Sequence, residues 1–208
     1  MRRVFLVRHG MRADNENRLW RLTAKRPDDP PLCARGVQQA RETGAYLRGR
    51  PIAALYCSPF LRAVQTAQMI YLETGIRFRV EPALGEWLSP AWFDRFPEII
   101  TPAEVRREYS GLDPAYRSPT VVTYPEPLED VDMFARIRPF LEQLDRTEAG
   151  EVVLVGHGAT VTQAARVLLG GADGPDAKLC SVTEFQKLSG RWECLGSTVE
   201  HLSFVAEE

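Results

Sequence analysis

The sequence predicts an α/β protein built on a parallel sheet, and two observations support this. Two apolar runs, Val4 to Val7 and Val152 to Val155, have the β-branched content and the abrupt ends of buried parallel strands, and each stops at a His-Gly pair. Between them, segments with helical spacing alternate with further short apolar runs. This alternation is typical of a parallel sheet whose strands are connected by helices.

The first predicted helix and the second predicted strand follow a polar, proline-rich stretch that extends to Pro31. Small and apolar residues then recur at helical spacing, so that one helix face carries Val37, Ala40, Gly44 and Leu47. A short apolar run at about 53–57 comes next and predicts a strand. A helix in this position can serve as the crossover between two parallel strands.

A second crossover helix is predicted to begin at Ser58. Ser58 is a favourable N-cap and Pro59 a favourable first helical residue. The helix is expected to run to about Tyr71, and Gly75 can terminate it. A short strand near 78–81 follows.

Residues 87–130 differ from the rest of the chain. The segment holds seven of the 15 prolines and a concentration of aromatic residues: Trp87, Trp92, Phe93, Phe96, Tyr109, Tyr116 and Tyr124. It is too aromatic for a disordered linker and too rich in proline for regular core elements. We therefore expect one domain over residues 1–208, with a folded insertion at about 87–130 that covers one sheet edge. The aromatic residues fit a small core for the insertion and a substrate pocket equally well.

The remaining elements complete the α/β pattern. A helix is predicted over about 131–145, and a second one over about 160–169, ended by two glycines. The last two runs, at about 181–188 and 191–195, predict a hairpin that turns at Ser189-Gly190.

Composition excludes several classes of protein. With 26 basic and 28 acidic residues the net charge is -2, so no general attraction to nucleic acid or to an anionic membrane is expected. No apolar run approaches the roughly 18 to 20 residues that span a bilayer, and no signal-peptide layout precedes Val4, so we expect a soluble cytoplasmic protein. The four cysteines, which we expect as buried reduced thiols without a metal, are scattered at Cys33, Cys57, Cys180 and Cys194.

Two of the three histidines stand at the position where open α/β sheets bind ligands. His9 and His157 each follow the carboxyl end of a predicted parallel strand, whereas His201 near the C-terminus is expected to be exposed. The two strand-end imidazoles are therefore expected to lie close together.

Charged residues converge on the same edge of the sheet. Arg8 and Arg12 flank His9, and Arg62 lies one turn into its predicted helix, from where its side chain leans back toward the N-terminal end. Glu86 follows the strand near 78–81. Phosphoryl transfer needs this combination: a nucleophile, cations for the phosphoryl oxygens and a proton donor for the leaving oxygen. Arginine suits the cation role because its planar fork matches phosphate oxygens.

Four runs of residues now point to a family. Residues 6–10 (Leu-Val-Arg-His-Gly), 58–67, 81–87 and 155–158 resemble, in this order, the motifs of the histidine phosphatase superfamily, which also contains the cofactor-dependent phosphoglycerate mutases. Within it, three features are most similar to the Sts/TULA branch and to ecdysteroid-phosphate phosphatases: Arg12, the run Asp29-Pro30-Pro31-Leu32 followed by Gly36, and the pair Glu86-Trp87.

The resemblance implies a fold and a role for each site residue. The fold would be a three-layer α/β/α sandwich on a six-stranded, mostly parallel sheet. His9 would be the phosphorylated nucleophile, and Glu86 the general acid that later activates water. The phosphoryl group and substrate would be bound by Arg8, Arg12, Arg62 and His157, with Trp87 beside them. No metal or other cofactor is implied.

We therefore expect a phosphatase that hydrolyses phosphate monoesters through phosphohistidine, with a preference for aryl phosphates such as phosphotyrosine because of the aromatic insertion. Its substrate would be a phosphorylated small molecule or a phosphopeptide. Two alternatives stay open: a phosphoglycerate mutase, disfavoured because Arg12 stands where mutases carry serine, and an inactive phosphopeptide-binding module. The sequence leaves the oligomeric state open, a homodimer included.

Overall fold

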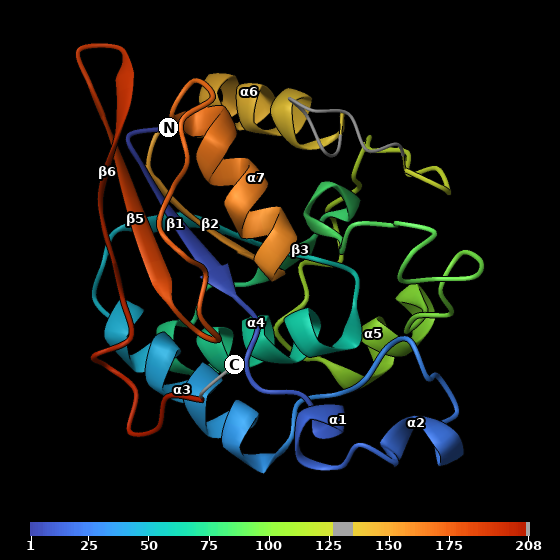
Figure 1. Ribbon diagram of the computed structural model, residues 1–208. Coiled ribbons are helices and arrows are strands. Elements are labelled where there is room, and N and C mark those ends of the chain that lie inside the picture. Colours follow the sequence, from blue (N-terminus) through green and yellow to red (C-terminus); the bar gives the residue numbers. More distant parts are fainter. Residues whose placement is uncertain (127–134, 207–208) are drawn as a thin grey trace.

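The computed structural model describes residues 1–126 and 135–206, and its centre is a six-stranded sheet. In space the strands follow the order β3-β2-β4-β1-β5-β6 (Figure 1). The first four in this order pair in parallel, and β5 and β6 are antiparallel to their neighbours. This confirms the predicted six-stranded, mostly parallel sheet. The strands are β1 (Arg3–Arg8), β2 (Ile52–Cys57), β3 (Phe78–Val80), β4 (Glu151–Gly156), β5 (Val182–Leu188) and β6 (Arg191–Thr198).

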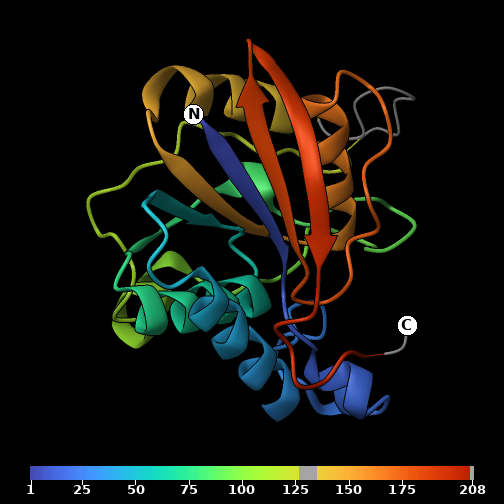
Figure 2. The same cartoon turned by 90° about the vertical axis from the view of Figure 1, so that its left-hand side faces the viewer.

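Helices cover both faces of the sheet and complete the three-layer sandwich. Figure 2 shows helices on either side of the strands. One layer contains α3 (Ala34–Leu47) and α4 (Leu61–Thr74), and the other contains α6 (Ile137–Thr147) and α7 (Gly158–Leu168). The shorter helices are α1 (Ala13–Glu16), α2 (Trp20–Thr23), the 3-10 turn η1 (Pro82–Leu84) and α5 (Pro102–Glu108).

The strand sequences explain the two cores. Successive side chains of a strand point to opposite faces of the sheet, so a strand that is buried on both faces is apolar throughout. In β1, Val4 and Leu6 pack with residues of α6 and α7, whereas Phe5 and Val7 pack with residues of α3 and α4. All four side chains are at most 1% exposed. The sheet is thereby held rigidly between its helices.

One predicted helix start is wrong, and another falls on residues outside those that the structure describes. The second crossover helix, α4, begins at Leu61 and not at Ser58, because Phe60 is the extended N-cap residue. The carboxylate of Asp29 accepts the backbone N–H of Leu61 at 2.7 Å, and this distant residue supplies the cap. At the other end Gly75, with φ +76°, terminates the helix as predicted. The helix predicted over 131–145 begins at Ile137 in the structure, and residues 131–134 of that prediction lie outside the described residues.

Residues 87–126, the described part of the predicted insertion, are largely irregular and lie against the edge of the sheet at β3. Phe78 exchanges backbone hydrogen bonds with the segment, donating to Gly111 O at 2.9 Å and accepting from Asp113 N at 2.8 Å. A small apolar cluster of Phe60, Leu88 and Phe93 anchors its first part. The aromatic residues of this segment thus differ in burial: the side chain of Phe93 is 9% exposed and packed, whereas that of Trp92 is 51% exposed.

The C-terminal elements agree with the sequence pattern. β5 and β6 form a hairpin in which Ser189 and Gly190 both have positive φ, as a two-residue turn between twisted strands requires. Nearby, His201 is not simply exposed as predicted, because its ring stacks on Tyr46 with centroids 4.8 Å apart.

Three of the four cysteines are buried and all four are free, but Cys194 on β6 is only partly buried. Among the described residues, no helix is both long and apolar enough to cross a membrane.

Candidate active site

The two strand-end histidines meet at the carboxyl edge of the sheet, as predicted. β1 and β4 are adjacent parallel strands, and the backbone N–H of His9 donates to Gly156 O at 2.9 Å. This bond continues the ladder by one residue and places the rings of His9 and His157 with centroids 5.2 Å apart. Both side chains are buried, at 2% and 0% exposure.

The surroundings of His9 prepare it to act as a nucleophile. Its Nδ1 lies 2.8 Å from Gly10 O, so Nδ1 carries the proton that is donated to this carbonyl, and Nε2 keeps its lone pair. Burial, followed by the charge of Arg62, lowers the pKa of His9 well below its usual value. The imidazole is therefore neutral at pH 7. The adjacent glycine is required sterically, because a Cβ at Gly10 would lie 2.5 Å from Gly36 O.

His157 is held by Ser58, which the sequence indicates only as a helix N-cap. Its Nε2 lies 2.7 Å from Oγ of Ser58, which directly follows β2. Oγ also accepts the N–H of Phe60 at 3.2 Å, and its own proton remains available to Nε2. When Nε2 accepts that proton, the ring proton of His157 resides on Nδ1, which lies 3.3 Å from Oε2 of Glu86. Burial, then Arg62 and His9, lower the pKa of His157 well below its usual value, so this ring too is neutral.

Arg62 brings the central positive charge. Its side chain is 2% exposed, and Nη2 lies 3.2 Å from Oε2 of Glu86. Asp29 lies 3.9 Å from Nη1, and the guanidinium stacks on the ring of Phe60. Within the described residues, Nε and Nη1 of Arg62 are buried without a hydrogen-bond partner. Buried N–H groups of this kind are costly unless a ligand accepts them, and phosphoryl oxygens would do so.

Glu86 joins the group through the loop that follows β3 and η1. Its Oε2 faces both Arg62 and His157, and its Oε1 accepts the backbone N–H of Trp87 at 3.2 Å. The structure thus brings together His9, His157, Arg62 and Glu86, four of the residues predicted from sequence.

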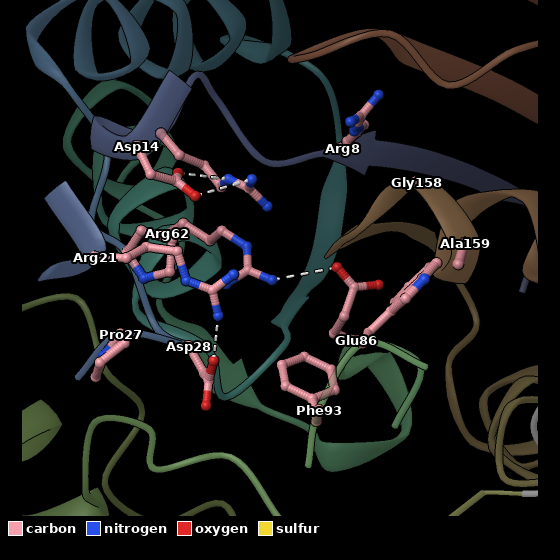
Figure 3. Close-up of a pocket in the computed structure, with 13 residues that line it drawn as sticks. Arg8, Asp14, Arg21, Pro27, Asp28, Arg62, Glu86, Phe93, Gly158 and Ala159 are labelled. Atoms are coloured by element: carbon pink, nitrogen blue, oxygen red, sulfur yellow. Dashed lines mark hydrogen bonds and ion pairs between the residues drawn. The ribbon is translucent and has the colours of Figure 1, made fainter. Parts of the chain in front are cut away.

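The other two predicted arginines lie at the wall of the cavity and are held by neighbouring groups. Nη1 of Arg8 donates to Ala177 O at 2.7 Å, and in the view of Figure 3 its guanidinium points away from Arg62 and Glu86. Arg12 forms two hydrogen bonds with Asp14, at 2.9 and 3.1 Å. A phosphoryl group that binds Arg12 would therefore have to compete with the Asp14 carboxylate for its guanidinium.

A cavity of about 350 Å³ opens at this edge of the sheet, and Arg62 and Glu86, which point toward one another, both line it (Figure 3). Trp92 and Phe93 line it, whereas Trp87 does not and instead packs edge-on against Trp92, with centroids 5.1 Å apart. The other residues that line it are Arg8, Arg12, Asp14, Arg21, Pro27, Asp28, Pro30, Gly158 and Ala159. Sequence reasoning noted Trp92 and Phe93 only as aromatic residues of the insertion.

No grouping of three or more His, Cys, Asp or Glu side chains suitable for a metal ion is found among residues 1–126 and 135–206. The positive charge of the site comes from guanidinium groups, those of Arg8, Arg12 and Arg62 among them. The arrangement as a whole is a buried, cation-lined site with a neutral imidazole, a second imidazole and a carboxyl group.

Comparison with known proteins assigns the chain to a family. Residues 4–199 match the Histidine phosphatase superfamily (branch 1), and the chain belongs to that superfamily. It is 27% identical to the human ubiquitin-associated and SH3 domain-containing protein A, over 98% of this chain and 38% of the relative. It is 24% identical to the ecdysteroid-phosphate phosphatase of Drosophila melanogaster, over 95% of this chain and 33% of the relative. The chain thus spans about a third of the length of these two relatives.

The fold is also similar to that of solved structures. The ecdysone phosphate phosphatase of Bombyx mori in complex with tungstate superposes with a TM-score of 0.77 at 21% identity, covering 100% of this chain and 96% of that one. The resemblance to the Sts/TULA and ecdysteroid-phosphate phosphatase branch, inferred from the sequence motifs, is confirmed by these comparisons.

Proposed function

We propose that this protein is a phosphomonoesterase that works through a phosphohistidine intermediate on His9. The state of His9 carries the proposal: a buried imidazole whose Nδ1 is held by Gly10 O and whose pKa is lowered, so that Nε2 presents a lone pair at neutral pH. The buried N–H groups of Arg62 lie at the same strand ends and supply the charge that a phosphoryl group needs. Membership of the superfamily supports the same chemistry.

The reaction has two steps. Nε2 of His9 attacks phosphorus in line with the leaving oxygen, a P–N bond forms as the P–O bond breaks, and the carboxyl group of Glu86 gives its proton to the leaving oxygen. In the second step the Glu86 carboxylate takes a proton from water, the water oxygen attacks phosphorus, and the P–N bond breaks. Phosphate leaves and His9 is neutral again. Arg62 and Nδ1–H of His157 bind the phosphoryl oxygens in both steps, joined by Arg8 and Arg12 from the wall.

Guanidinium groups supply the positive charge in this mechanism, so the proposed reaction uses no metal ion. EDTA should leave the rate unchanged, and vanadate should inhibit strongly because it can imitate the pentacoordinate transition state. Dependence of the rate on added magnesium or zinc would contradict this part of the proposal.

Hydrolysis fits the mouth of the site better than a mutase reaction does. A phosphoglycerate mutase must also bind the carboxylate of its substrate. At the mouth, Arg12 is already assigned to the phosphoryl group, and Arg21 is paired with Asp28 at 2.6 Å. An inactive phosphopeptide-binding module would not need a carboxyl group beside Arg62 and His157, where Glu86 lies.

The lining of the cavity supports a preference for aryl phosphates. Trp92 and Phe93 both line the pocket, and Trp92, which is 51% exposed, offers a ring on which an aromatic leaving group would stack. Trp92→Ala should reduce kcat/KM for aryl phosphates by roughly 2- to 10-fold relative to sugar phosphates, the range expected for one aromatic pair. Trp192→Ala, on β6, is the matched control and should change neither. Equal kcat/KM of the wild-type protein for phosphotyrosine peptides and sugar phosphates would remove the preference.

The proposed reaction is tested by varying the leaving group. p-Nitrophenolate departs readily without a proton, whereas an alkyl alkoxide does not, so loss of a general acid affects the two unequally. Glu86→Gln should therefore lower kcat/KM for alkyl phosphates by about 10² to 10⁴-fold and that for p-nitrophenyl phosphate much less. Equal slowing of both substrates would show that Glu86 only supports the pocket.

A further inference from the structure

The loop that carries Glu86 is held from behind by a buried arginine. Arg136, the N-cap residue of α6, is 9% exposed, and its guanidinium points into the main chain of residues 82–86. Nη1 donates to Ala83 O at 2.8 Å, and more weakly to Gly85 O at 3.2 Å and Pro82 O at 3.3 Å. Nη2 donates to Glu86 O at 2.9 Å. One side chain thus bonds four carbonyl groups of a five-residue stretch.

A buried carboxylate completes this arrangement. Glu126 is 7% exposed and accepts Nε and Nη2 of Arg136 at 2.6 and 2.8 Å. Its Oε2 also accepts the backbone N–H of Leu88 at 2.9 Å. The main chain is therefore fixed on both sides of the Glu86 side chain. Arg136 bonds carbonyl groups up to that of Glu86, and Glu126 bonds the N–H of Leu88. A buried ion pair is costly to desolvate, and these short, directed bonds offset that cost.

The contacts of the Glu86 side chain itself are long by comparison. Its carboxylate oxygens lie 3.2 Å from Nη2 of Arg62, 3.3 Å from Nδ1 of His157 and 3.2 Å from the N–H of Trp87. Charge-assisted hydrogen bonds are normally 2.7 to 2.9 Å long, so these contacts alone would hold the carboxyl group loosely. The stronger constraint is on the backbone, where Thr160 also donates to Gly85 O at 2.8 Å.

We propose that Arg136, locked by Glu126, is a positioning residue that places the Glu86 carboxyl group for proton transfer to the leaving oxygen. This inference rests on the proposed function, because it assigns Arg136 a role in the general-acid step. Arg136 contacts main-chain carbonyls and Glu126, so it acts through Glu86 and not on the substrate. A displacement of about 1 Å in a reacting group can cost on the order of 10²-fold in rate.

The test measures the ratio of kcat/KM for p-nitrophenyl phosphate to kcat/KM for an alkyl phosphate in purified, full-length variants. Arg136→Lys keeps the charge but loses the planar fork, and should raise this ratio by about 10- to 100-fold. Adding Arg136→Lys to Glu86→Gln should not raise the ratio beyond that of Glu86→Gln alone, since both changes remove the same step. A purely structural role would lower both rates together and leave the ratio unchanged.

Arg79→Lys is the matched control. Arg79 is a partly buried arginine that bonds Tyr56, Asp113 and Glu148 at the β2 and β3 edge, away from Glu86. Its replacement should leave the ratio at the wild-type value. If Arg136→Lys yields no folded protein, Glu126→Gln decides the question, because it loosens the same guanidinium while keeping the amide oxygen as an acceptor for Leu88.

The outcomes separate this inference from the proposed function. The positioning role alone is overturned if Glu86→Gln raises the ratio but folded Arg136→Lys leaves it unchanged. The same holds for an unchanged ratio in Glu126→Gln, where that variant decides. An unchanged ratio in Glu86→Gln itself overturns the proposed acid and, with it, this inference. A ratio raised in Glu86→Gln and in the Arg136 or Glu126 variant, but not in Arg79→Lys, supports both.

Discussion

Replacement of Ser58 by alanine tests the hydrogen bond that orients His157. The change removes the donor to Nε2 of His157, 2.7 Å away, and the acceptor of the Phe60 N–H, 3.2 Å away. Both groups are buried and would be left without these partners. A buried polar group left unpaired costs about 1 to 3 kcal/mol, and the Phe60 bond is the longer one, so Ser58→Ala should lower the free energy of unfolding by about 2 to 4 kcal/mol.

The same substitution should also affect catalysis. Without the serine proton, only the 3.3 Å contact with Glu86 favours a ring proton on Nδ1 of His157, and the donor to the phosphoryl group is lost for part of the time. Loss of a hydrogen bond worth about 1.4 kcal/mol in the transition state lowers kcat/KM by roughly 10-fold. Urea denaturation and steady-state kinetics with p-nitrophenyl phosphate measure the two effects on the same preparation.

Ser181→Ala is the matched control for this prediction. Ser181 is as buried as Ser58, at 1% exposure, but its Oγ has no hydrogen-bond partner within the described residues. Its removal should leave the free energy of unfolding unchanged or slightly higher, and kcat/KM unchanged. Equal losses of stability in the two variants, or full activity in Ser58→Ala, would refute the role given to the serine.

Three further predictions follow from the buried charges and the close backbone contacts of the site. The pKa values of His9 and His157 lie well below about 6.5, where unfolded imidazoles titrate, so the unfolded state binds more protons than the folded state as the pH falls from 7 to 5. The free energy of unfolding should therefore drop by up to about 1.4 kcal/mol per pH unit for each ring. In urea denaturation at several pH values, a His9→Asn/His157→Asn variant should show a shallower slope. Arg62→Ala should lower kcat/KM by roughly 10² to 10⁴-fold, as loss of a positioned electrostatic group does, whereas a loss below about 5-fold would move the phosphoryl site away from this residue. Gly10→Ala should unfold at a lower urea concentration than the wild-type protein, because its Cβ would meet the main chain at Gly36; an unchanged midpoint would contradict the contact.

Sequence patterns sufficed for those parts of the fold and site that depend on local rules. The apolar runs at β1 and β4 predict buried parallel strands, and a residue that follows such a strand must lie at the carboxyl edge of the sheet. His9 and His157 are therefore found beside one another. Arg62 reaches the same edge because helical side chains lean toward the N-terminal end of their helix.

The errors arise where distant residues decide the local structure. Ser58 looked like an N-cap, but α4 begins at Leu61 because Asp29, 32 residues earlier, caps it. Ser58 is thereby freed to bond His157, a contact across 99 residues that no local pattern shows. Arg136 was placed inside a predicted helix, and its role depends on Glu126 and the Glu86 loop, which only the folded chain brings together.

The measurement that tests the proposed mechanism most directly is the identification of the phosphorylated residue. Brief incubation with labelled substrate, followed by a quench without acid and peptide mapping, should place the label on His9. The adduct should be stable in base and labile in acid, and His9→Ala should form no adduct and lose several orders of magnitude in kcat. Label on a cysteine or an aspartate, or full turnover by His9→Ala, would contradict the mechanism.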